Sequence, residues 1–485
     1  MQKMEAVGKW DVYEVVLDGP QNGNPFTDVD LSAVFTCGTK RVTVTGFYNG
    51  NGNYVVRFMP DTTGVWRFRT RSNRRQLSGH TGSLRCISPA RGNHGPVRVA
   101  QQYHFAYADG TPFIPVGTTA YAWIHQSKAL IETTFKTLAK SPFNKIRMCT
   151  FPKDYDFNKN EPWEFPYDKK ADGTFDFTRF NPVFFNRLES YIRRLGVMGI
   201  QADMILLHPY DRWGFSNMGK DADDRYLAYI TARLAAFHNV WWSMANEFDF
   251  MRAKKREEWD RFCSVVRKND PYRHLLSIHN GMPQDMYEHD KPWISHVSLQ
   301  WQEEDPGFVR TLRDKYGKPV VVDECGYEGS INHGWGNLTP QELNHKCWSF
   351  VIQGGHAACH GETYYRNDEI LWWAKGGPLH GKSPARMAFM RKTLERCAWP
   401  MEPSPVVGSW DFKAVGSDRA GDYLLYFGRK QPAFRDVNLP KGKRFRAEVI
   451  DTWNMTVTKL PGRYRGWCRI LLPARPWIVL RLKTV

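Results

Sequence analysis

The stretch from Val240 to Phe250, VWWSMANEFDF, constrains the fold of this chain more than any other. It opens with a short, mostly apolar run of strand type, and the run ends directly at Asn246-Glu247. A buried parallel strand presents polar side chains at its carboxyl end, where the strand leaves the core. The pattern therefore predicts a parallel sheet with functional residues along one edge.

A second run of the same type, PVVVDE at 319–324, ends in Glu324, 77 residues after Glu247. Each strand–helix unit of a (β/α)8 barrel takes roughly 30 residues, so the interval holds about three units. If the first strand begins near Phe113, the two acids end the fourth and seventh strands. Two carboxyl groups that face each other across a barrel mouth, roughly 5–5.5 Å apart, are what a retaining glycosidase requires.

The texture of the sequence changes twice, which divides the chain into three domains. Residues 1–96 contain short alternating runs between turn signals, including NGNGN at 49–53, and predict an N-terminal Ig-like β-sandwich. Residues 97–403 alternate strands with helices, which predicts a catalytic (β/α)8 barrel. Residues 404–485 return to β-type runs and predict a C-terminal β-sandwich. The expected fold class is therefore α/β, a TIM barrel flanked by two β-sandwich domains.

The barrel region contains eight strand-type runs with helical segments between them. The expected strands are 112–120, 145–151, 201–208, 240–247, 274–280, 294–301, 319–324 and 356–364. The expected helices are 181–195, 223–237, 257–268, 306–315, 339–353 and 383–396, and Thr339-Pro340 is a typical helix start.

Charge and composition narrow the classes of partner. The formal net charge is +17, but the basic excess lies in the two flanking domains and not in the barrel. In residues 404–485 these charges alternate with apolar residues, as on a half-solvated strand, so we expect no nucleic-acid partner. Aromatic residues make up 14% of the chain, with 19 Trp. Core packing accounts for most of them, and sugar stacking is the alternative at individual positions.

The cysteines and the N-terminus bear on cellular location. The nine cysteines are scattered and contain no CxxC pair, which argues against a disulfide framework or a zinc site and fits a reducing compartment. The first residues contain no apolar signal segment, and no apolar run approaches 18 residues. These features predict a cytoplasmic protein without a membrane partner, although a secreted protein trimmed for expression would begin in the same way. The oligomeric state is left open.

The Asn-Glu pair that ends one strand and the Glu that ends another, three strands on, resemble the clan A retaining glycoside hydrolases over roughly residues 110–396. The resemblance implies a TIM barrel in which Glu247 is the acid/base and Glu324 the nucleophile. It also implies that Asn246 bonds the sugar 2-hydroxyl and that Arg147 keeps the nucleophile ionised, because an adjacent cation lowers the pKa of a carboxylate. Neighbouring side chains alternate along a strand, so Asn246 and Glu247 can both face substrate only if the strand end is bulged or twisted. The flanking segments resemble β-domains that accompany such barrels in bacterial members.

Other strand ends supply candidate substrate-binding residues. His208 and His279 end the third and fifth expected strands, and each is open to two interpretations, contact with substrate or a local hydrogen bond. Trp301 ends the sixth, where many clan members carry Tyr or His. This departure leaves Gln300 or Tyr327 to orient the nucleophile.

The eighth expected strand places His356, His360 and Glu362 on one face by alternation. A metal site is one interpretation, but inward layers of barrel strands commonly hold such residues, and we expect no metal and no cofactor. Glu362 is then a candidate acceptor for a sugar hydroxyl. Trp123, which follows the first strand, is a candidate stacking platform.

The expected function is a retaining β-glycosidase that hydrolyses O-glycosidic bonds by double displacement, in exo mode on small oligosaccharides or glycoconjugates. The alternatives are an endo-acting glycanase of the same clan and a non-catalytic carbohydrate-binding barrel, which the presence of both carboxylates disfavours. An esterase is disfavoured because the chain contains no GxSxG motif. The sequence does not identify the sugar, since related glycosidases differ by single loop contacts.

Overall fold

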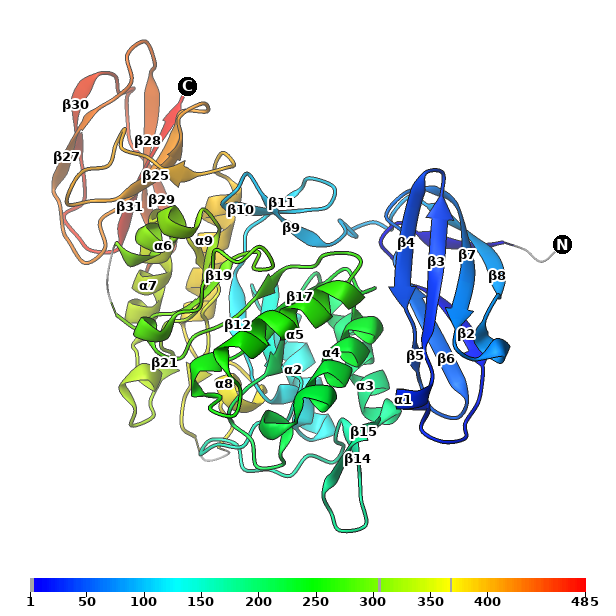
Figure 1. Cartoon of the computed structure of the whole chain (residues 1–485). Helices are drawn as coiled ribbons and strands as arrows, with labels where there is room; N and C mark the ends of the chain where they lie inside the picture. The colour runs from blue at the N-terminus through cyan, green and yellow to red at the C-terminus, as the bar shows by residue number, and fades with distance from the viewer. Residues whose placement is uncertain (1–3, 304–306, 367–368) are drawn as a thin grey trace.

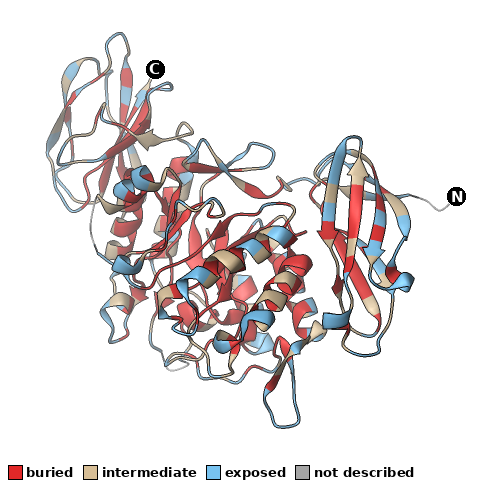
Figure 2. Cartoon of the chain, viewed as in Figure 1, coloured by how far each residue is buried: buried red, intermediate tan, exposed pale blue. Residues whose placement is uncertain are grey.

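The computed structural model describes residues 4–303, 307–366 and 369–485. Figure 1 shows β-rich regions at both ends of the chain and a mixed α/β region between them. Buried residues follow the central strands and the inward sides of the helices around them (Figure 2). Within the described ranges, no helix combines the length and the hydrophobicity that a membrane span needs.

The N-terminal region consists of two sheets that pack on each other. Phe35 of one sheet stacks on Phe58 of the other, with ring centroids 4.0 Å apart. The NGNGN turn lies between two strands as expected, with Gly50, Asn51 and Gly52 all at positive φ. The two-sheet arrangement agrees with a sandwich, and an Ig-like topology stays a prediction. The sheet of order β1-β8-β7-β3-β4 contains β1 (Glu5–Gly8), β8 (Thr81–Ile87), β7 (Gly64–Ser72), β3 (Leu31–Cys37) and β4 (Lys40–Thr45), and the sheet of order β2-β6-β5 contains β2 (Tyr13–Asp18), β6 (Asn53–Phe58) and β5 (Phe47–Tyr48).

A small antiparallel sheet of β9 (Val97–Ala100), β10 (His104–Tyr107) and β11 (Pro112–Phe113) follows. Phe105 and Phe113 join a buried cluster with Trp241 and Val321, which lie near the amino ends of two parallel strands. The sheet therefore covers the end of the parallel strands that is opposite to the carboxylates. The expected first strand, 112–120, is wrong in extent, because its start pairs with β10 and not with the parallel sheet.

Eight short parallel strands form the centre of the molecule. They are β12 (Gly117–Thr119), β13 (Lys145–Cys149), β16 (Gln201–Leu207), β17 (Val240–Ala245), β18 (Leu276–Ser277), β19 (Val297–Gln300), β20 (Val320–Glu324) and β22 (His356–Ala357). The first five form one sheet and the last three another. Single parallel bridges, His279–Ser298 and Thr118–His360, connect the edges of the two sheets. As expected, β17 and β20 are the fourth and seventh of these strands along the chain.

Helices follow most of these strands, because their apolar faces cover the sheet. Thr339 starts its helix as predicted, with a reciprocal capping box to Glu342. The helix at 128–138 was not among the expected ones. The bounds are α2 (Lys128–Leu138), α3 (Pro182–Val197), α4 (Lys220–Leu234), α5 (Arg256–Asn269), α6 (Phe308–Tyr316), α7 (Pro340–Ile352), α8 (Trp372–Lys375) and α9 (Ser383–Glu395), and a short α1 (Pro25–Asp28) precedes them in the N-terminal region.

The eighth expected strand, 356–364, is interrupted. β22 ends at Ala357, and residues 362–363 form β23 (Glu362–Thr363), which pairs with β21 (Glu328–Gly329) in the loop after β20. A further hairpin, β14 (Tyr167–Lys169) and β15 (Phe175–Phe180), extends from the loop after β13.

The C-terminal region is again built from sheets. Its six-stranded sheet has the order β24-β25-β26-β31-β28-β29, and β27 pairs with β30. The apolar cluster under α7 continues into this region through Leu424, Tyr426 and Val479. The bounds are β24 (Glu402–Pro403), β25 (Ala414–Ser417), β26 (Asp422–Tyr426), β31 (Ile478–Thr484), β28 (Phe445–Asp451), β29 (Thr456–Lys459), β27 (Phe434–Asn438) and β30 (Trp467–Leu471).

A buried ion-pair network attaches the N-terminal region to the centre. Arg57 of β6 contacts Glu189 of α3 at 3.0 Å, and Arg233 of α4 contacts the same carboxylate at 2.5 Å. All three side chains are buried, so removal of Glu189 would leave the Arg233 guanidinium buried without its ion pair, at a cost of about 3–5 kcal/mol.

Candidate active site

The fourth parallel strand delivers two consecutive polar side chains to one place. β17 ends at Ala245, and Glu247 adopts a left-handed backbone with φ 51° and ψ 57°. This conformation is uncommon outside glycine and interrupts the alternation of the strand, so Asn246 and Glu247 can lie together. The irregular strand end that both residues require is therefore present.

The carboxylate of Asp249, two residues past Glu247, stabilises this strained turn. Asp249 accepts hydrogen bonds from the backbone amides of Gly281 at 2.6 Å and Met282 at 2.8 Å. A Cβ atom on Gly281 would lie 2.7 Å from the Phe250 ring and 3.2 Å from Cβ of Glu247. Only glycine therefore lets the loop after β18 approach the loop after β17 so closely.

Glu324, at the end of β20, is surrounded by hydrogen-bond donors. Its Oε1 accepts from Arg147 at 2.9 Å, from His279 Nε2 at 3.2 Å and from the hydroxyl of Tyr121. Its Oε2 accepts from the hydroxyl of Tyr327 at 2.8 Å. Burial alone would raise the pKa of Glu324, but His279, Arg147 and Tyr121 outweigh burial and lower that pKa to about 2. This carboxyl group is therefore ionised.

Glu247 has a different environment. Its Oε2 accepts hydrogen bonds from Asn246 Nδ2 at 3.1 Å and from the hydroxyl of Tyr210, and no described cation forms an ion pair with it. Burial, and next the charge of Glu324, raise its pKa above the ordinary value. Of the two carboxyl groups, Glu247 is therefore the one that binds a proton more readily.

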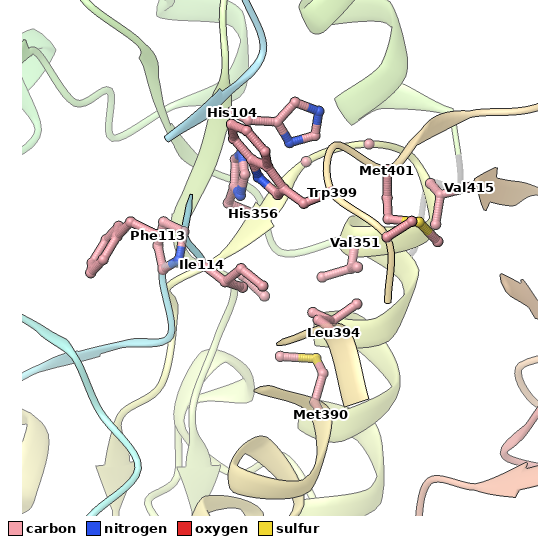
Figure 3. Close-up of a pocket in the computed structure, with 15 residues that line it drawn as sticks. His104, Phe113, Ile114, Val351, His356, Met390, Leu394, Trp399, Met401 and Val415 are labelled. Atoms are coloured by element: carbon pink, nitrogen blue, oxygen red, sulfur yellow. The ribbon is translucent and has the colours of Figure 1, made fainter. Parts of the chain in front are cut away.

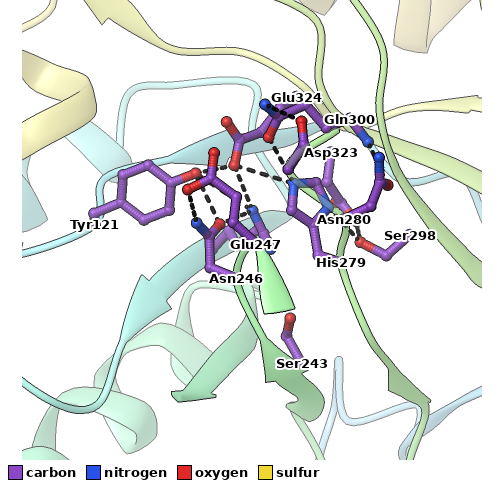
Figure 4. Close-up of polar contacts among 12 residues, drawn as sticks. Tyr121, Ser243, Asn246, Glu247, His279, Asn280, Ser298, Gln300, Asp323 and Glu324 are labelled. Carbon is purple, nitrogen blue, oxygen red and sulfur yellow. Dashed lines mark hydrogen bonds and ion pairs between the residues drawn. The ribbon is translucent and has the colours of Figure 1, made fainter. Parts of the chain in front are cut away.

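Asn246 connects the two carboxyl groups, as Figure 4 shows. Its Oδ1 accepts from Arg147 at 2.9 Å and lies 3.1 Å from the Tyr121 hydroxyl, which donates to Glu324, while its Nδ2 donates to Glu247. Burial and the charge of Glu324 raise the pKa of Tyr121, so this hydroxyl stays protonated and donates. The amide is thereby held in one orientation between the two acids.

A buried network of ion pairs and hydrogen bonds orients His279, which contacts Glu324. Lys145 pairs with Asp203 at 2.5 Å and with Asp323 at 2.7 Å. Asp323 also accepts from Ser298 at 2.5 Å, and Ser298 contacts Nδ1 of His279 at 3.0 Å. Asp323 therefore faces away from substrate, and His279 is oriented toward Glu324 by a chain of side chains that reaches through the sheet.

Glu247 and Glu324 line one pocket of about 290 Å³ at the carboxyl ends of the parallel strands. Aromatic side chains form much of its wall, and Trp335 and Trp373 lie with ring centroids 4.9 Å apart. The residues that line this pocket are Tyr121, Lys153, Tyr155, Asp156, Phe157, Tyr210, Glu247, Gln300, Gln302, Glu324, Gly326, Tyr327, His333, Trp335 and Trp373.

A second cavity, of about 60 Å³, lies near the opposite ends of the strands (Figure 3). Its two histidines are both engaged, His104 with Glu402 at 2.7 Å and His356 with the carbonyl of Tyr103 at 3.0 Å. Burial lowers the pKa of His104 to about 4 and of His356 to about 3, so both rings are neutral. The cavity is lined mainly by apolar side chains and contains no carboxylate pair.

Four of the eight residues expected to bind substrate have side chains that neither line this pocket nor contact the carboxyl groups of Glu247 and Glu324. Trp123 is fully buried in the core, where its indole packs on Phe135 with centroids 5.0 Å apart, so it cannot serve as a stacking platform. His208 bonds the carbonyl of Phe151 through Nε2 at 3.2 Å. Trp301 stacks on Phe308 with centroids 3.9 Å apart.

Glu362 is the fourth. Its Oε2 accepts from the backbone amide of His380 at 2.6 Å, so it anchors the loop before α9. The strand on which His356, His360 and Glu362 were expected to alternate breaks after Ala357, although His360 Nε2 lies 3.7 Å from Glu362 Oε1. Among the described residues, no cluster of three or more His, Cys, Asp and Glu side chains has a metal-binding arrangement.

The structure adds residues that sequence reasoning missed, notably Tyr121, Lys153 and Tyr210. Tyr121 lies two residues past β12, and Tyr210 lies three past β16. Position just after a parallel strand is a signal that could have selected both tyrosines. Lys153 lies further into its loop and carries no comparable signal.

A carboxyl group with a raised pKa beside one with a lowered pKa, in an aromatic pocket at the carboxyl ends of parallel strands, is the arrangement expected of a glycoside hydrolase. Residues 100–410, more than half of the chain, match the family described as Apiosidase-like, catalytic domain. The chain belongs to this family. Residues 6–73 and 410–483 match two domains of unknown function, DUF5060 and DUF5605. Among curated proteins, none matches the sequence.

Solved structures agree with this family. A protein of Bacteroides vulgatus ATCC 8482, provisionally described as a glycoside hydrolase, is 39% identical with a TM-score of 0.94, over 99% of this chain and 100% of that chain. A family 5 glycoside hydrolase from the same organism is 14% identical with a TM-score of 0.61, over 81% of this chain and 94% of its own. A family 39 glycoside hydrolase of Bacteroides cellulosilyticus is 12% identical with a TM-score of 0.50, over 99% of each chain. The last two are similar to this chain in fold alone.

Proposed function

We propose that the protein is a retaining β-glycosidase that hydrolyses O-glycosidic bonds of small oligosaccharides or glycoconjugates in exo mode. Residues 97–403 would then form the catalytic (β/α)8 barrel, with β-sandwich domains at 1–96 and 404–485. The observation that carries the proposal is the contrast between two carboxyl groups in one pocket. The pKa of Glu324 is lowered to about 2, whereas that of Glu247 is raised.

In the first step, Glu324 attacks the anomeric carbon and forms a glycosyl-enzyme ester. Three donors hold Oε1, whereas Tyr327 alone contacts Oε2, so Oε2 is the oxygen that is freer to attack. The bond to the leaving group breaks as Glu247 transfers its proton to the departing oxygen. Glu247 is then a carboxylate.

In the second step, this carboxylate takes a proton from a water molecule, whose oxygen attacks the anomeric carbon. The ester bond to Glu324 breaks and the sugar leaves with its original configuration. Asn246 lies between the two acids and is positioned to bond the sugar 2-hydroxyl, as the clan resemblance implies. When the ester bond breaks, Glu324 regains its negative charge, and Arg147 stabilises that charge.

The family description points to apiosides as substrates, and we include them in the proposal. The test is a panel of aryl α- and β-glycosides, with an aryl apioside among them, combined with NMR detection of the first-formed anomer. Turnover of a β-glycoside with retention is the expected result. An inverted first product would mean that Glu324 activates a water molecule as a general base and is not the nucleophile. Preferential cleavage inside longer oligosaccharides would favour the endo-acting alternative. No turnover of any panel member, with tight sugar binding, would favour a binding protein.

A further inference from the structure

Lys153, in the loop after β13, is almost fully buried, with 2% of its surface exposed, yet it lines the catalytic pocket. Four aromatic rings surround its ammonium group. Nζ lies 3.5 Å from the ring centroid of Tyr121, 4.2 Å from Tyr210, 4.6 Å from Tyr155 and 5.6 Å from Trp373. These distances are within the range of cation–π attraction.

The ammonium group has no hydrogen-bond acceptor and no ion-pair partner among the described residues. The other buried lysines all have partners. Lys145 pairs with Asp203 and Asp323, Lys254 pairs with Asp223 at 2.6 Å, and Lys346 donates to the carbonyl of Cys325 at 2.8 Å. A buried charge without a partner is costly, and ring faces offset that cost without accepting its three N–H groups in ordinary hydrogen bonds.

The position of the cage is as informative as its composition. Tyr121 donates its hydroxyl to Glu324, and Tyr210 donates its hydroxyl to Glu247. Two of the four rings around Lys153 therefore belong to the tyrosines that bond the two carboxyl groups. The ammonium group contacts the faces of both rings on the pocket wall. Burial lowers the pKa of Lys153, and both carboxylates act in the opposite direction.

We propose that Lys153 is a substrate-binding residue that donates its free N–H groups to an oxygen of the glycoside bound between Glu247 and Glu324. This inference rests on the proposed glycosidase function. The aromatic cage keeps the N–H groups oriented but without hydrogen-bond acceptors until a sugar oxygen binds. In the free enzyme the residue lowers stability, and in the complex it raises affinity and specificity.

The competing interpretation is structural, with the cation holding the four rings together. The two roles predict opposite effects on stability. If Lys153 serves the substrate, Lys153→Met removes an unpaired buried charge and fills the space with an apolar chain that packs well on aromatic rings. We then expect an unchanged or higher Tm. If the cation holds the cage, Tm falls.

The matched control is Lys254→Met, because Lys254 is also buried but is paired with Asp223 and lies outside the pocket. Its loss leaves Asp223 buried without its partner, so we expect a clearly lower Tm and unchanged kcat/KM for the folded fraction. Lys153→Met should instead reduce kcat/KM about 10- to 100-fold, the worth of a hydrogen bond from a charged donor. Lys153→Gln, which retains an uncharged donor of similar length, supplies the same measurements if the Met variant does not fold.

Monodeoxy versions of the best aryl glycoside identify the oxygen. For one deoxy substrate, we expect removal of the hydroxyl to lower kcat/KM of the wild type but not to lower kcat/KM of Lys153→Met any further. The two losses are then non-additive at that hydroxyl. Wild-type activity in Lys153→Met, a Tm that falls as in Lys254→Met, or additive losses at every hydroxyl would each overturn the assignment. If the wild type itself turns over no glycoside, the proposed function fails first, and the two failures are thereby distinguished.

Discussion

Glu324 and Glu247 both follow parallel strands and line the same pocket, yet their surroundings favour opposite charge states. Glu324 receives hydrogen bonds or ion pairs from Arg147, His279, Tyr121 and Tyr327. Glu247 receives them from two neutral groups and feels the negative field of its partner. Both carboxyl groups are buried, so burial does not decide between them. The number and charge of the donors differ, and this difference separates the two pKa values.

The contrast also sets the expected pH dependence. The proposed reaction requires Glu324 ionised, so kcat/KM should fall as pH falls through its pKa of about 2. The reaction requires Glu247 protonated, so kcat/KM should fall as pH rises through its raised pKa. Each variant below tests one side of this comparison.

The largest effect should come from Glu324→Ala. Without the nucleophile no glycosyl-enzyme forms, and we expect turnover of every substrate to fall by at least about 10⁴-fold. Azide, which fits the space left by the carboxylate, should attack a β-glycoside with a good leaving group and give the α-glycosyl azide. Product NMR measures this. A β-glycosyl azide would mean that the two acids have exchanged roles.

Glu247→Ala should have the next largest effect, and the size should depend on the leaving group. We expect a loss of about 10²–10⁴-fold with poor leaving groups, because general acid catalysis is missing. A dinitrophenyl glycoside departs without protonation, so it should still form the glycosyl-enzyme. Azide should then speed breakdown of that intermediate to the β-glycosyl azide. Equal losses for good and poor leaving groups would contradict the acid role.

Tyr121→Phe removes one hydrogen bond from ionised Glu324. The pKa of Glu324 should rise by about one unit, since a hydrogen bond to a charged group contributes about 1.5–3 kcal/mol and one pKa unit corresponds to 1.36 kcal/mol. The acidic limb of the kcat/KM profile should therefore move to higher pH, with the basic limb unmoved. A steady-state pH profile measures both limbs. An unmoved acidic limb would remove Tyr121 from the support of the nucleophile.

Tyr210→Phe is the matched change at the other acid and should have the smallest effect. The Tyr210 hydroxyl lowers the pKa of Glu247, so its loss should raise that pKa further. The basic limb should move to higher pH by about one unit or less, with the acidic limb unmoved. The pair of Phe variants serves as its own control, because each deletes one hydroxyl on one side of the site. Movement of the same limb in both variants would show that the two environments are not separate.

Much of the catalytic arrangement could be predicted from local pattern. An apolar run that ends in a polar residue marks the carboxyl end of a parallel strand, and this identified the positions of Asn246, Glu247 and Glu324. Arg147 was predicted from the family resemblance. The order of elements follows for the same reason. Strand and helix periodicities are properties of neighbouring residues, so β17 and β20 could be counted as fourth and seventh before their contacts were known.

Long-range contacts decided the rest. Trp123 follows the first parallel strand and carries a ring suited to sugar stacking, yet its direction depends on Phe135 and Tyr191, and it lies in the core. Glu362 was expected at the pocket mouth, but the strand breaks before it and its carboxylate binds the loop ahead of α9.

The cage around Lys153 has the same origin. Its rings come from Tyr121, Tyr155 and Tyr210, which lie in three different loops, and from Trp373 of α8, and no periodicity in the sequence connects them. The direction of a side chain within a strand or helix is set by the local backbone, so the periodicity of the sequence is enough to place it. Side chains in loops point where distant parts of the chain leave room and partners, which a one-dimensional pattern does not contain.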